Sequence, residues 1–131
     1  MTPSLDRVDH IHVYVTDREI SELWYREVLG LSPMPSLESW AADGGPLTIA
    51  NKAGTVHLAL FERKAQPCRS TIAFGVTARE FIAWREHLCA ALEAPPTSED
   101  LQLSWSLYFN DPDGNPYEIT TYEYAAVEHL S

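Results

Sequence analysis

Two histidines and one glutamate stand in segments whose alternating pattern is typical of β-strands. Apolar residues occupy every second position of residues 11–15 and 56–60, and they also flank position 118. Because successive side chains of a strand point to opposite faces, His10, His57 and Glu118 fall on the face opposite these apolar residues. Two imidazoles and one carboxylate suit one divalent ion such as Zn²⁺, Ni²⁺, Mn²⁺ or Fe²⁺, with open positions left for water or substrate.

Each of these residues also has a purely structural interpretation. A strand histidine can be a structural or exposed residue, and a slip of one residue in register would turn His57 to the other face. Glu118 is harder to explain structurally, because a carboxylate between apolar neighbours is costly to bury unless a cation or hydrogen bonds compensate it. His12 shares the face of His10 and is a candidate catalytic base or a polar wall of a pocket.

Aromatic residues accompany the same face. Tyr14, Phe61 and Tyr108 are expected to line the concave side of the sheet, with Trp40 and Trp105 at its rim. These side chains could instead fill a small core. An aromatic pocket suits an organic substrate that contains a ring. No Lys or Arg falls on a concave strand position, so phosphonates and other anions fit poorly.

The elements that position these residues occur twice. An offset of 61 residues superposes residues 11–19 on residues 72–80, with Ile, Val, Thr, Arg and Glu in matching places. Each segment is an alternating run that ends in Thr-x-x-Glu, at Thr16 and at Thr77. This pattern is a capping box that opens a helix. The sequence therefore predicts a strand followed by a capped helix in each half.

Apolar faces at helical spacing extend both helices, and Gly30 is expected to end the first. The apolar residues are Ile20, Leu23, Trp24 and Val28 in the first helix, and Phe81, Trp84, Leu88 and Leu92 in the second. Strand-like runs follow at about 36–42, 46–51 and 55–62, and again at about 103–110 and 116–122, with a weaker run near 94–96. Two β-α-β-β-β repeats, at about 7–62 and 68–123, thus form one domain of 131 residues with a C-terminal tail at 124–131.

Three motifs of the chain resemble the vicinal oxygen chelate superfamily, which includes glyoxalase I, extradiol dioxygenases and bleomycin-resistance proteins. The motifs are Asp-His-Ile-His-Val at 9–13, Trp-Tyr-Arg-Glu-Val-Leu-Gly-Leu at 24–31 and Asp-Pro-Asp-Gly-Asn-Pro-Tyr-Glu-Ile at 111–119. The resemblance implies an α+β fold in which two β-α-β-β-β repeats form a half-barrel sheet with helices on the outside. It implies a glyoxalase-like or dioxygenase-like metalloprotein, in which one divalent ion acts as a Lewis acid on a small substrate with adjacent oxygens.

The resemblance also places the ligands on the first and last strands of each repeat. The 61-residue offset maps His10 onto Thr71 and His57 onto Glu118. Thr71 departs from the superfamily, whose catalytic members mostly carry His there, and is counted with the substrate pocket. His57 supplies a good ligand where glyoxalase-like members have Glu, so the ligand count remains three. Isomerase, lyase or dioxygenase chemistry would follow.

The charge of the chain supports an alternative function. Nine Lys+Arg against nineteen Asp+Glu give −10, and the last basic residue is Arg85. This balance argues against nucleic acids and anionic membrane surfaces as partners. A metal-free protein of the bleomycin-resistance type, which sequesters a small cationic or aromatic ligand, would suit the acidity and Thr71.

The sequence also gives expectations for the oligomeric state and the cellular location of the protein. A homodimer is expected, because a half-barrel leaves open edges and an unfilled concave face. Many single-domain members of the superfamily build each site across such a dimer. The first residues lack the features of a signal peptide, and Cys68 and Cys89 lie in no metal or redox spacing. A cytoplasmic protein with free thiols is therefore expected.

Overall fold

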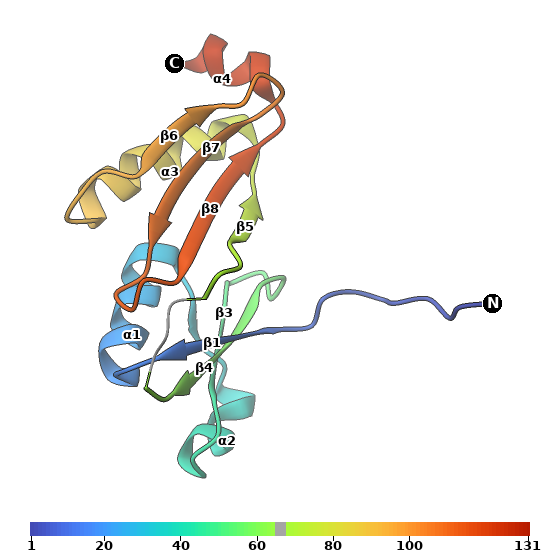
Figure 1. The fold of residues 1–131 in the computed structure, drawn as a ribbon, viewed down its shortest axis with the longest axis vertical. Coiled ribbons are helices and arrows are strands. Elements are labelled where there is room, and N and C mark those ends of the chain that lie inside the picture. Colours follow the sequence, from blue (N-terminus) through green and yellow to red (C-terminus); the bar gives the residue numbers. More distant parts are fainter. Residues whose placement is uncertain (65–67) are drawn as a thin grey trace. The chain divides into compact units, whose positions relative to one another are not determined.

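The computed structural model describes residues 1–64 and 68–131, which form two compact units (Figure 1). Residues 1–64 are called the first unit and residues 68–131 the second unit. Each unit holds one four-stranded sheet and its own helices. The predicted α+β class and the repeat of a β-α-β-β-β module are thereby confirmed.

The first unit has the sheet order β1-β4-β3-β2, in which β1 runs parallel to β4 and the other pairs are antiparallel. A π-helical turn, Tyr25–Leu29, continues helix α1 and ends at Gly30, whose φ of 70° gives the predicted left-handed stop. The elements are β1 (Ile11–Val15), α1 (Arg18–Trp24), β2 (Ser32–Pro33), a 3₁₀ turn (Pro35–Leu37), α2 (Glu38–Ala42), β3 (Leu47–Ala50) and β4 (His57–Glu62).

The second unit repeats this topology in the order β5-β8-β7-β6, with β5 parallel to β8. Its elements are β5 (Ile72–Gly75), α3 (Ala78–Ala91), β6 (Thr97–Asp100), β7 (Trp105–Asn110), β8 (Pro116–Thr121) and α4 (Tyr124–Leu130). The residues expected as a tail therefore form helix α4, in which Val127 is buried. In α4, Tyr124 Oη donates a 2.8 Å hydrogen bond to Asp100 Oδ2 of β6.

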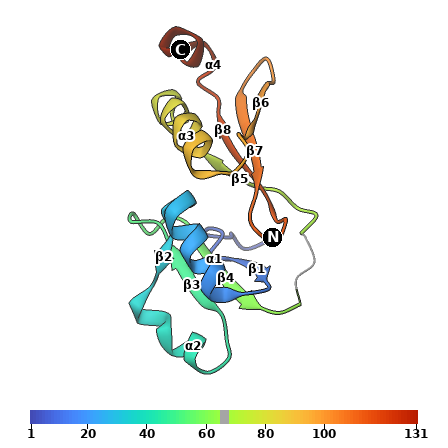
Figure 2. The same cartoon turned by 90° about the vertical axis from the view of Figure 1, so that its left-hand side faces the viewer.

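Helices cover one face of each sheet. Figure 2 shows α3 along one face of the second sheet, where Phe81 and Leu88 are fully buried. In the first unit, Tyr25 and Val28 are buried together with Val13 and Val15 of β1. The apolar alternation of the strands is thus satisfied on the helix side, and the other face of each sheet carries the polar residues.

The two helices that follow the first strand of each repeat begin differently. Helix α3 has the predicted capping box, since Thr77 Oγ1 accepts from Glu80 N and the Glu80 side chain accepts from Thr77 N. Helix α1 is capped by Asp17 and not by Thr16, because Asp17 Oδ1 accepts from the backbone N–H groups of residues 19 and 20. An aspartate is at least as good a cap as threonine, so the helix starts one residue later.

Three further expectations differ from the structure. Residues 36–42 are helical and not a strand, because Pro35 starts a 3₁₀ turn that leads into α2. The weak strand expected near 94–96 is β6, at 97–100. Ile20 and Leu23 are 60% and 46% exposed, because α1 turns Ser21 and Tyr25 toward the core instead.

The segment between β7 and β8 is a turn held by its own side chains. Asp111 Oδ1 accepts from the backbone N–H groups of Asp113 and Asn115, and Gly114 has a φ of 86°. Asn115 Nδ2 donates to Asp111 Oδ2, while Asn115 Oδ1 accepts from Cys68 N. The side chains of the predicted turn at 111–115 thus hold the backbone, and this role accounts for Asp111 and Asn115 without a catalytic one.

The helices and the cysteines of the described residues each answer one further question. None of the helices in the described part of the chain is long and apolar enough to cross a membrane. Cys68 and Cys89 are exposed free thiols.

Candidate functional site

The face of the first sheet that points away from the helices carries three histidines. His57 starts β4, His10 directly precedes β1, and His12 lies within β1 opposite Ala59. Directly paired residues share a face, and so do alternate residues along a strand. We call this surface the histidine face. The first unit therefore carries His10, His12 and His57 on a common face, as predicted.

Asp9 holds two of these imidazoles. Its Oδ2 lies 2.9 Å from Nδ1 of His10, and its backbone oxygen lies 3.1 Å from Nδ1 of His57. A carboxylate and a carbonyl oxygen can only accept, so both Nδ1 atoms donate. A ring that carries a single proton then has its lone pair at Nε2. This arrangement of an oxygen acceptor behind each imidazole is typical of metal-binding histidines.

The charge of Asp9 is maintained by its neighbours. The hydrogen bond with His10 lowers the pKa of Asp9 below its ordinary value, and the charge of Arg7 lowers it further. Arg7 Nη2 lies 3.2 Å from Asp9 Oδ1. Asp9 is therefore a carboxylate at neutral pH, as the acceptor role requires.

His12 is close to His10. Their Nε2 atoms are 3.0 Å apart, and the ring centroids are 5.0 Å apart with an angle of 25° between the ring planes. The other neighbour of the His12 ring is Phe61, whose centroid lies 4.6 Å away. His12 is thus held between a histidine and an aromatic ring, with its Nε2 directed at that of His10.

Two of the expected aromatic residues lie on the histidine face. Tyr14 and Phe61 pair across β1 and β4 with ring centroids 5.7 Å apart. The guanidinium carbon of Arg63 lies 5.2 Å from the centroid of Phe61 and 5.7 Å from that of Tyr14. The prediction concerned strand positions only and therefore missed Arg63, which lies just beyond the end of β4 and places its guanidinium over both rings.

Glu118 occupies the corresponding face of the second sheet, together with Tyr108 and Ala73, its partners on the two neighbouring strands. Its side chain is half-buried, and Oε2 accepts a 2.6 Å hydrogen bond from Oγ of Ser106. Burial, and after it the charge of Glu118, raise the pKa of Tyr108, so that this phenol stays protonated at neutral pH. Thr71 is exposed and lies two residues before Ala73, on the same side.

The two tryptophans lie elsewhere. Trp105 pairs with Thr121 and stands on the opposite face of its sheet from Glu118. It stacks on Tyr124 with ring centroids 5.9 Å apart, and its buried Nε1 has no hydrogen-bond partner among the described residues. Trp40 is 53% exposed on helix α2. Trp105 is therefore not on the face of its sheet that carries Glu118.

The register of the parallel strand pairs differs between the two units. Ile11 pairs with Leu58 in the first unit, whereas Ile72, its counterpart at an offset of 61, pairs with Tyr117. The offset for the last strand is therefore 59, so the counterpart of Glu118 is Ala59. His57 stays on the predicted face because the shift is an even number of residues, but the ungapped mapping of His57 onto Glu118 does not hold.

The described residues offer ligands in two groups. His10, His12 and His57 belong to the first unit, and Glu118 belongs to the second. In residues 1–64 and 68–131, no three His, Cys, Asp or Glu side chains are grouped closely enough to hold one ion as they stand. His10 and His12 bring two imidazole nitrogens to 3.0 Å from each other.

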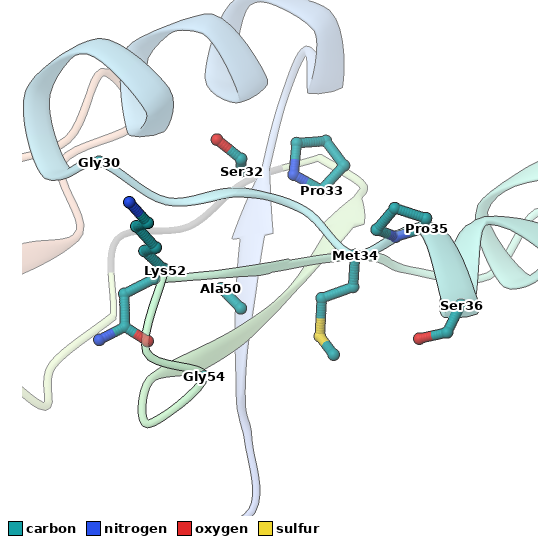
Figure 3. A pocket seen from close by; sticks show the side chains of 10 residues that line it. Gly30, Ser32, Pro33, Met34, Pro35, Ser36, Ala50, Lys52 and Gly54 are labelled. Atoms are coloured by element: carbon teal, nitrogen blue, oxygen red, sulfur yellow. The ribbon is translucent and has the colours of Figure 1, made fainter.

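A pocket of about 480 Å³ lies in the first unit, between β2 and the turn that joins β3 to β4 (Figure 3). Met34, Ala50 and Gly54 are among its lining residues, and Lys52 is the charged side chain among them. Its lining includes none of the predicted site residues. The sequence did not predict this pocket, because it forms where short irregular segments meet.

The comparisons with solved structures support the fold. A glyoxylase/bleomycin resistance protein/dioxygenase domain from Frankia sp. EAN1pec is 22% identical, with a TM-score of 0.73 over 98% of this chain and 100% of that one. A glyoxalase/dioxygenase from Nostoc punctiforme is 20% identical, with a TM-score of 0.67 over 93% and 98%. These similarities confirm the predicted glyoxalase-like fold.

A third similar structure contains a metal ion. It is a variant of the fosfomycin resistance protein FosX from Listeria monocytogenes, bound to Mn(II) and a dihydroxypropylphosphonic acid. It is 15% identical, with a TM-score of 0.70 over 90% of this chain and 93% of that one. No protein-family model matches the sequence, and a sequence search of proteins with curated descriptions found no match.

Proposed function

We propose that this chain binds one divalent metal ion and acts on a small organic molecule that carries adjacent oxygen atoms. The proposed ligands are His10, His57 and Glu118. The observation that carries the proposal is the double role of Asp9, which holds Nδ1 of His10 and of His57. Each ring with one proton then has its lone pair at Nε2, and Nε2 of His10 lies 3.0 Å from Nε2 of His12.

The ion, when bound, would supply Lewis acidity toward the substrate oxygens, as in an isomerase, a lyase or a dioxygenase. The protein supplies the contacts around it. Tyr14 and Phe61 present ring surface to an organic substrate, and Arg63 beside them can pair with an anionic group. The Mn(II)-containing FosX structure supports a metal-binding role for this fold.

The alternative is a metal-free protein that sequesters a cationic or aromatic ligand. The exposed ring of Tyr14 and the charge of −10 favour it. Arg63 disfavours the cationic version, because a guanidinium already lies over both aromatic rings and would have to be displaced.

Metal analysis tests the proposal. Protein purified without chelator or affinity tag should contain one equivalent of a transition metal, and both His10→Ala and Glu118→Gln should lose it. His129→Ala, an exposed histidine of α4, is the matched control and should keep the metal. Metal-free wild-type protein that is folded by circular dichroism and takes up no added Zn²⁺, Ni²⁺, Mn²⁺ or Fe²⁺ would overturn the proposal. In that case, calorimetric binding of a cationic glycopeptide would support the alternative.

A further inference from the structure

We infer that the pocket of the first unit binds a small aliphatic carboxylate, with the acid group at Lys52. The inference goes beyond the proposed function, because it needs no metal ion and uses none of the proposed metal ligands. All the residues that line the pocket belong to the first unit. The shape, the walls, the charge and the position of the pocket each support the inference.

The pocket forms at the outer edge of the first sheet. Strand β2 is the outermost strand and is only two residues long, so the chain leaves the sheet at Met34 and enters the 3₁₀ turn. The turn after β3 is held by Asn51, whose Oδ1 accepts from the backbone N–H groups of Thr55 and Val56. The two segments enclose about 480 Å³. Small-molecule sites typically have volumes of about 300–1,000 Å³.

The walls of the pocket favour a saturated hydrocarbon body. Apolar surface comes from Pro33, Met34, Pro35 and Ala50, and none of the described residues that line the pocket is aromatic. Met34 is half-buried, and the flexible side chain of a methionine adapts to the shape of an alkyl chain. A ring would find no stacking partner on these walls. An aliphatic body therefore fits them better than an aromatic one.

Lys52 gives the pocket its positive charge. Figure 3 shows the Lys52 side chain extending from the turn after β3 toward the segment of Gly30 and Ser32. In the described part of the chain, no carboxylate pairs with this ammonium group, although nineteen acidic residues face nine basic ones in the sequence. An ammonium group beside an apolar pocket and without a protein counter-ion can pair with the acid group of a ligand.

The other polar groups of the pocket favour one negative charge over two. The hydroxyl groups of Ser32 and Ser36 can each donate one hydrogen bond. The amide of Asn51 is already used within its turn, where Nδ2 donates to Thr55 Oγ1. One cation and two neutral donors match a carboxylate. A phosphate dianion would bring a second, uncompensated negative charge to a chain whose net charge is −10.

The pocket adjoins the histidine face. Ser32 pairs with Ala50, and Ala50 pairs with His57, so these three side chains form one row across β2, β3 and β4. The Cβ atoms of directly paired residues lie about 4.5–5.5 Å apart. The wall at Ala50 is therefore one strand away from the ring of His57, and that ring is a second reporter of a ligand in the pocket.

Methyl NMR of Met34 tests the inference. The chain has two methionines, so ¹³C-methyl labelling gives one signal from Met34 in the pocket and one from Met1, which is exposed at the chain end. Sodium hexanoate, added to metal-depleted protein with a chelator present, should shift the Met34 signal to saturation and leave the Met1 signal unchanged. The ring protons of His57 should shift with the same dissociation constant.

Two analogues test the chemical class of the ligand. Hexanamide has the same body without the charge and should bind about 10-fold more weakly than hexanoate, because it lacks a charge-assisted contact. Hexyl phosphate, which carries up to two negative charges, should also bind more weakly than hexanoate.

Two lysine variants separate a specific contact from a general effect of charge. Lys52→Gln keeps most of the length of the side chain and should weaken hexanoate binding about 10-fold. Lys64→Gln is the matched control, because Lys64 is exposed and does not line the pocket. It should bind hexanoate as the wild type does.

Several outcomes would overturn the inference. A Met34 signal that does not move with hexanoate would show that the pocket does not take this ligand. Equal binding of hexanamide, or tighter binding of hexyl phosphate, would exclude a carboxylate as the preferred group. Equal effects of Lys52→Gln and Lys64→Gln would exclude a specific contact at Lys52. None of these results bears on the proposed metal site, because the measurements contain no metal and His10→Ala tests that site separately.

Discussion

Asp9 connects residues of two different strands through two different oxygen atoms. Its carboxylate binds His10, the next residue in the chain, and its backbone carbonyl binds His57, which is 48 residues away. The first contact is local and could be foreseen from the Asp-His pair. The second depends on the pairing of β1 with β4, which brings the two strand starts together. Alternation predicted the face of both histidines but not what holds them.

Removing the carboxylate of Asp9 should lower the metal affinity of the proposed site without removing a metal ligand. In Asp9→Ala the backbone carbonyl still holds His57, but Nδ1 of His10 loses its acceptor. Loss of such an outer partner typically lowers metal affinity 10–100-fold, and calorimetry with Zn²⁺ should show a loss of about this size. Asp6→Ala, which removes another exposed carboxylate bound to Arg7, is the control and should have little effect. Equal affinities of Asp9→Ala and the wild type would contradict the positioning role.

Arg63 shows where reasoning from single strands fails at the residue scale. It lies just outside β4, so the alternation of the strand gives no direction for its side chain. Only the folded structure shows that its guanidinium lies over Phe61 and Tyr14. A search for an arginine within two residues of a predicted aromatic pair could have found this contact.

At the scale of elements, patterns that are local in the sequence were reliable. Alternating runs predicted β3, β4, β7 and β8, and Thr77 predicted the start of α3 because a capping box involves only four residues. Residues 36–42 were assigned to the wrong kind of element because Pro35 starts a helical turn within a stretch too short to show a clear period.

The register of β4 could not be predicted from the repeat. The paired residues of the parallel strands are 47 positions apart in the first unit, at Ile11 and Leu58, and 45 apart in the second, at Ile72 and Tyr117. The two additional residues belong to the connections and leave no mark in the strands themselves. An offset derived from the first strand therefore fails for the last one.

The contact between α4 and β6 gives a prediction for this pair of elements. The hydrogen bond to Asp100 raises the pKa of Tyr124 to about 12, from an ordinary value of 10.0. Asp100→Asn should lower this pKa toward 10, which an ultraviolet titration of the tyrosines measures, with Tyr124→Phe identifying the transition. Because the folded state holds this proton more tightly, the bond stabilises the fold fully below pH 10 and progressively less as the pH rises toward 12.

Glu93→Gln is the matched control for that titration, because Glu93 is an exposed carboxylate outside the contact. Its titration should equal that of the wild type. A late tyrosine transition that persists in Asp100→Asn would show that Asp100 does not hold Tyr124 in solution.

At the scale of the whole molecule, each sheet has two outer strands and one face that no helix of its own unit covers. Such edges carry unpaired backbone groups. The histidine face is exposed at His10, His12 and Tyr14, and α1 exposes Ile20 and Leu23. The topology of both units was predictable because the repeat is visible in the sequence and each module follows ordinary rules of strand and helix order.

These exposed surfaces lead us to expect a homodimer. Sedimentation velocity at micromolar concentration should give twice the 14.7 kDa mass of the chain. Ile20→Asp/Leu23→Asp tests the exposed side of α1 and should shift the protein toward monomer if that side is buried between copies. A wild-type protein that sediments as a 14.7 kDa species at every concentration would contradict the expectation.

The pairs His12–Ala59 and Ala73–Glu118 occupy corresponding positions in the two units, and one member of each pair is an alanine. Two substitutions at such a cross-strand pair can move a polar side chain from one strand to its neighbour while it keeps its face of the sheet. A comparison of the two repeats by sequence column would then record two unrelated changes. Repeats of this kind are therefore better compared by facing pairs than by single columns.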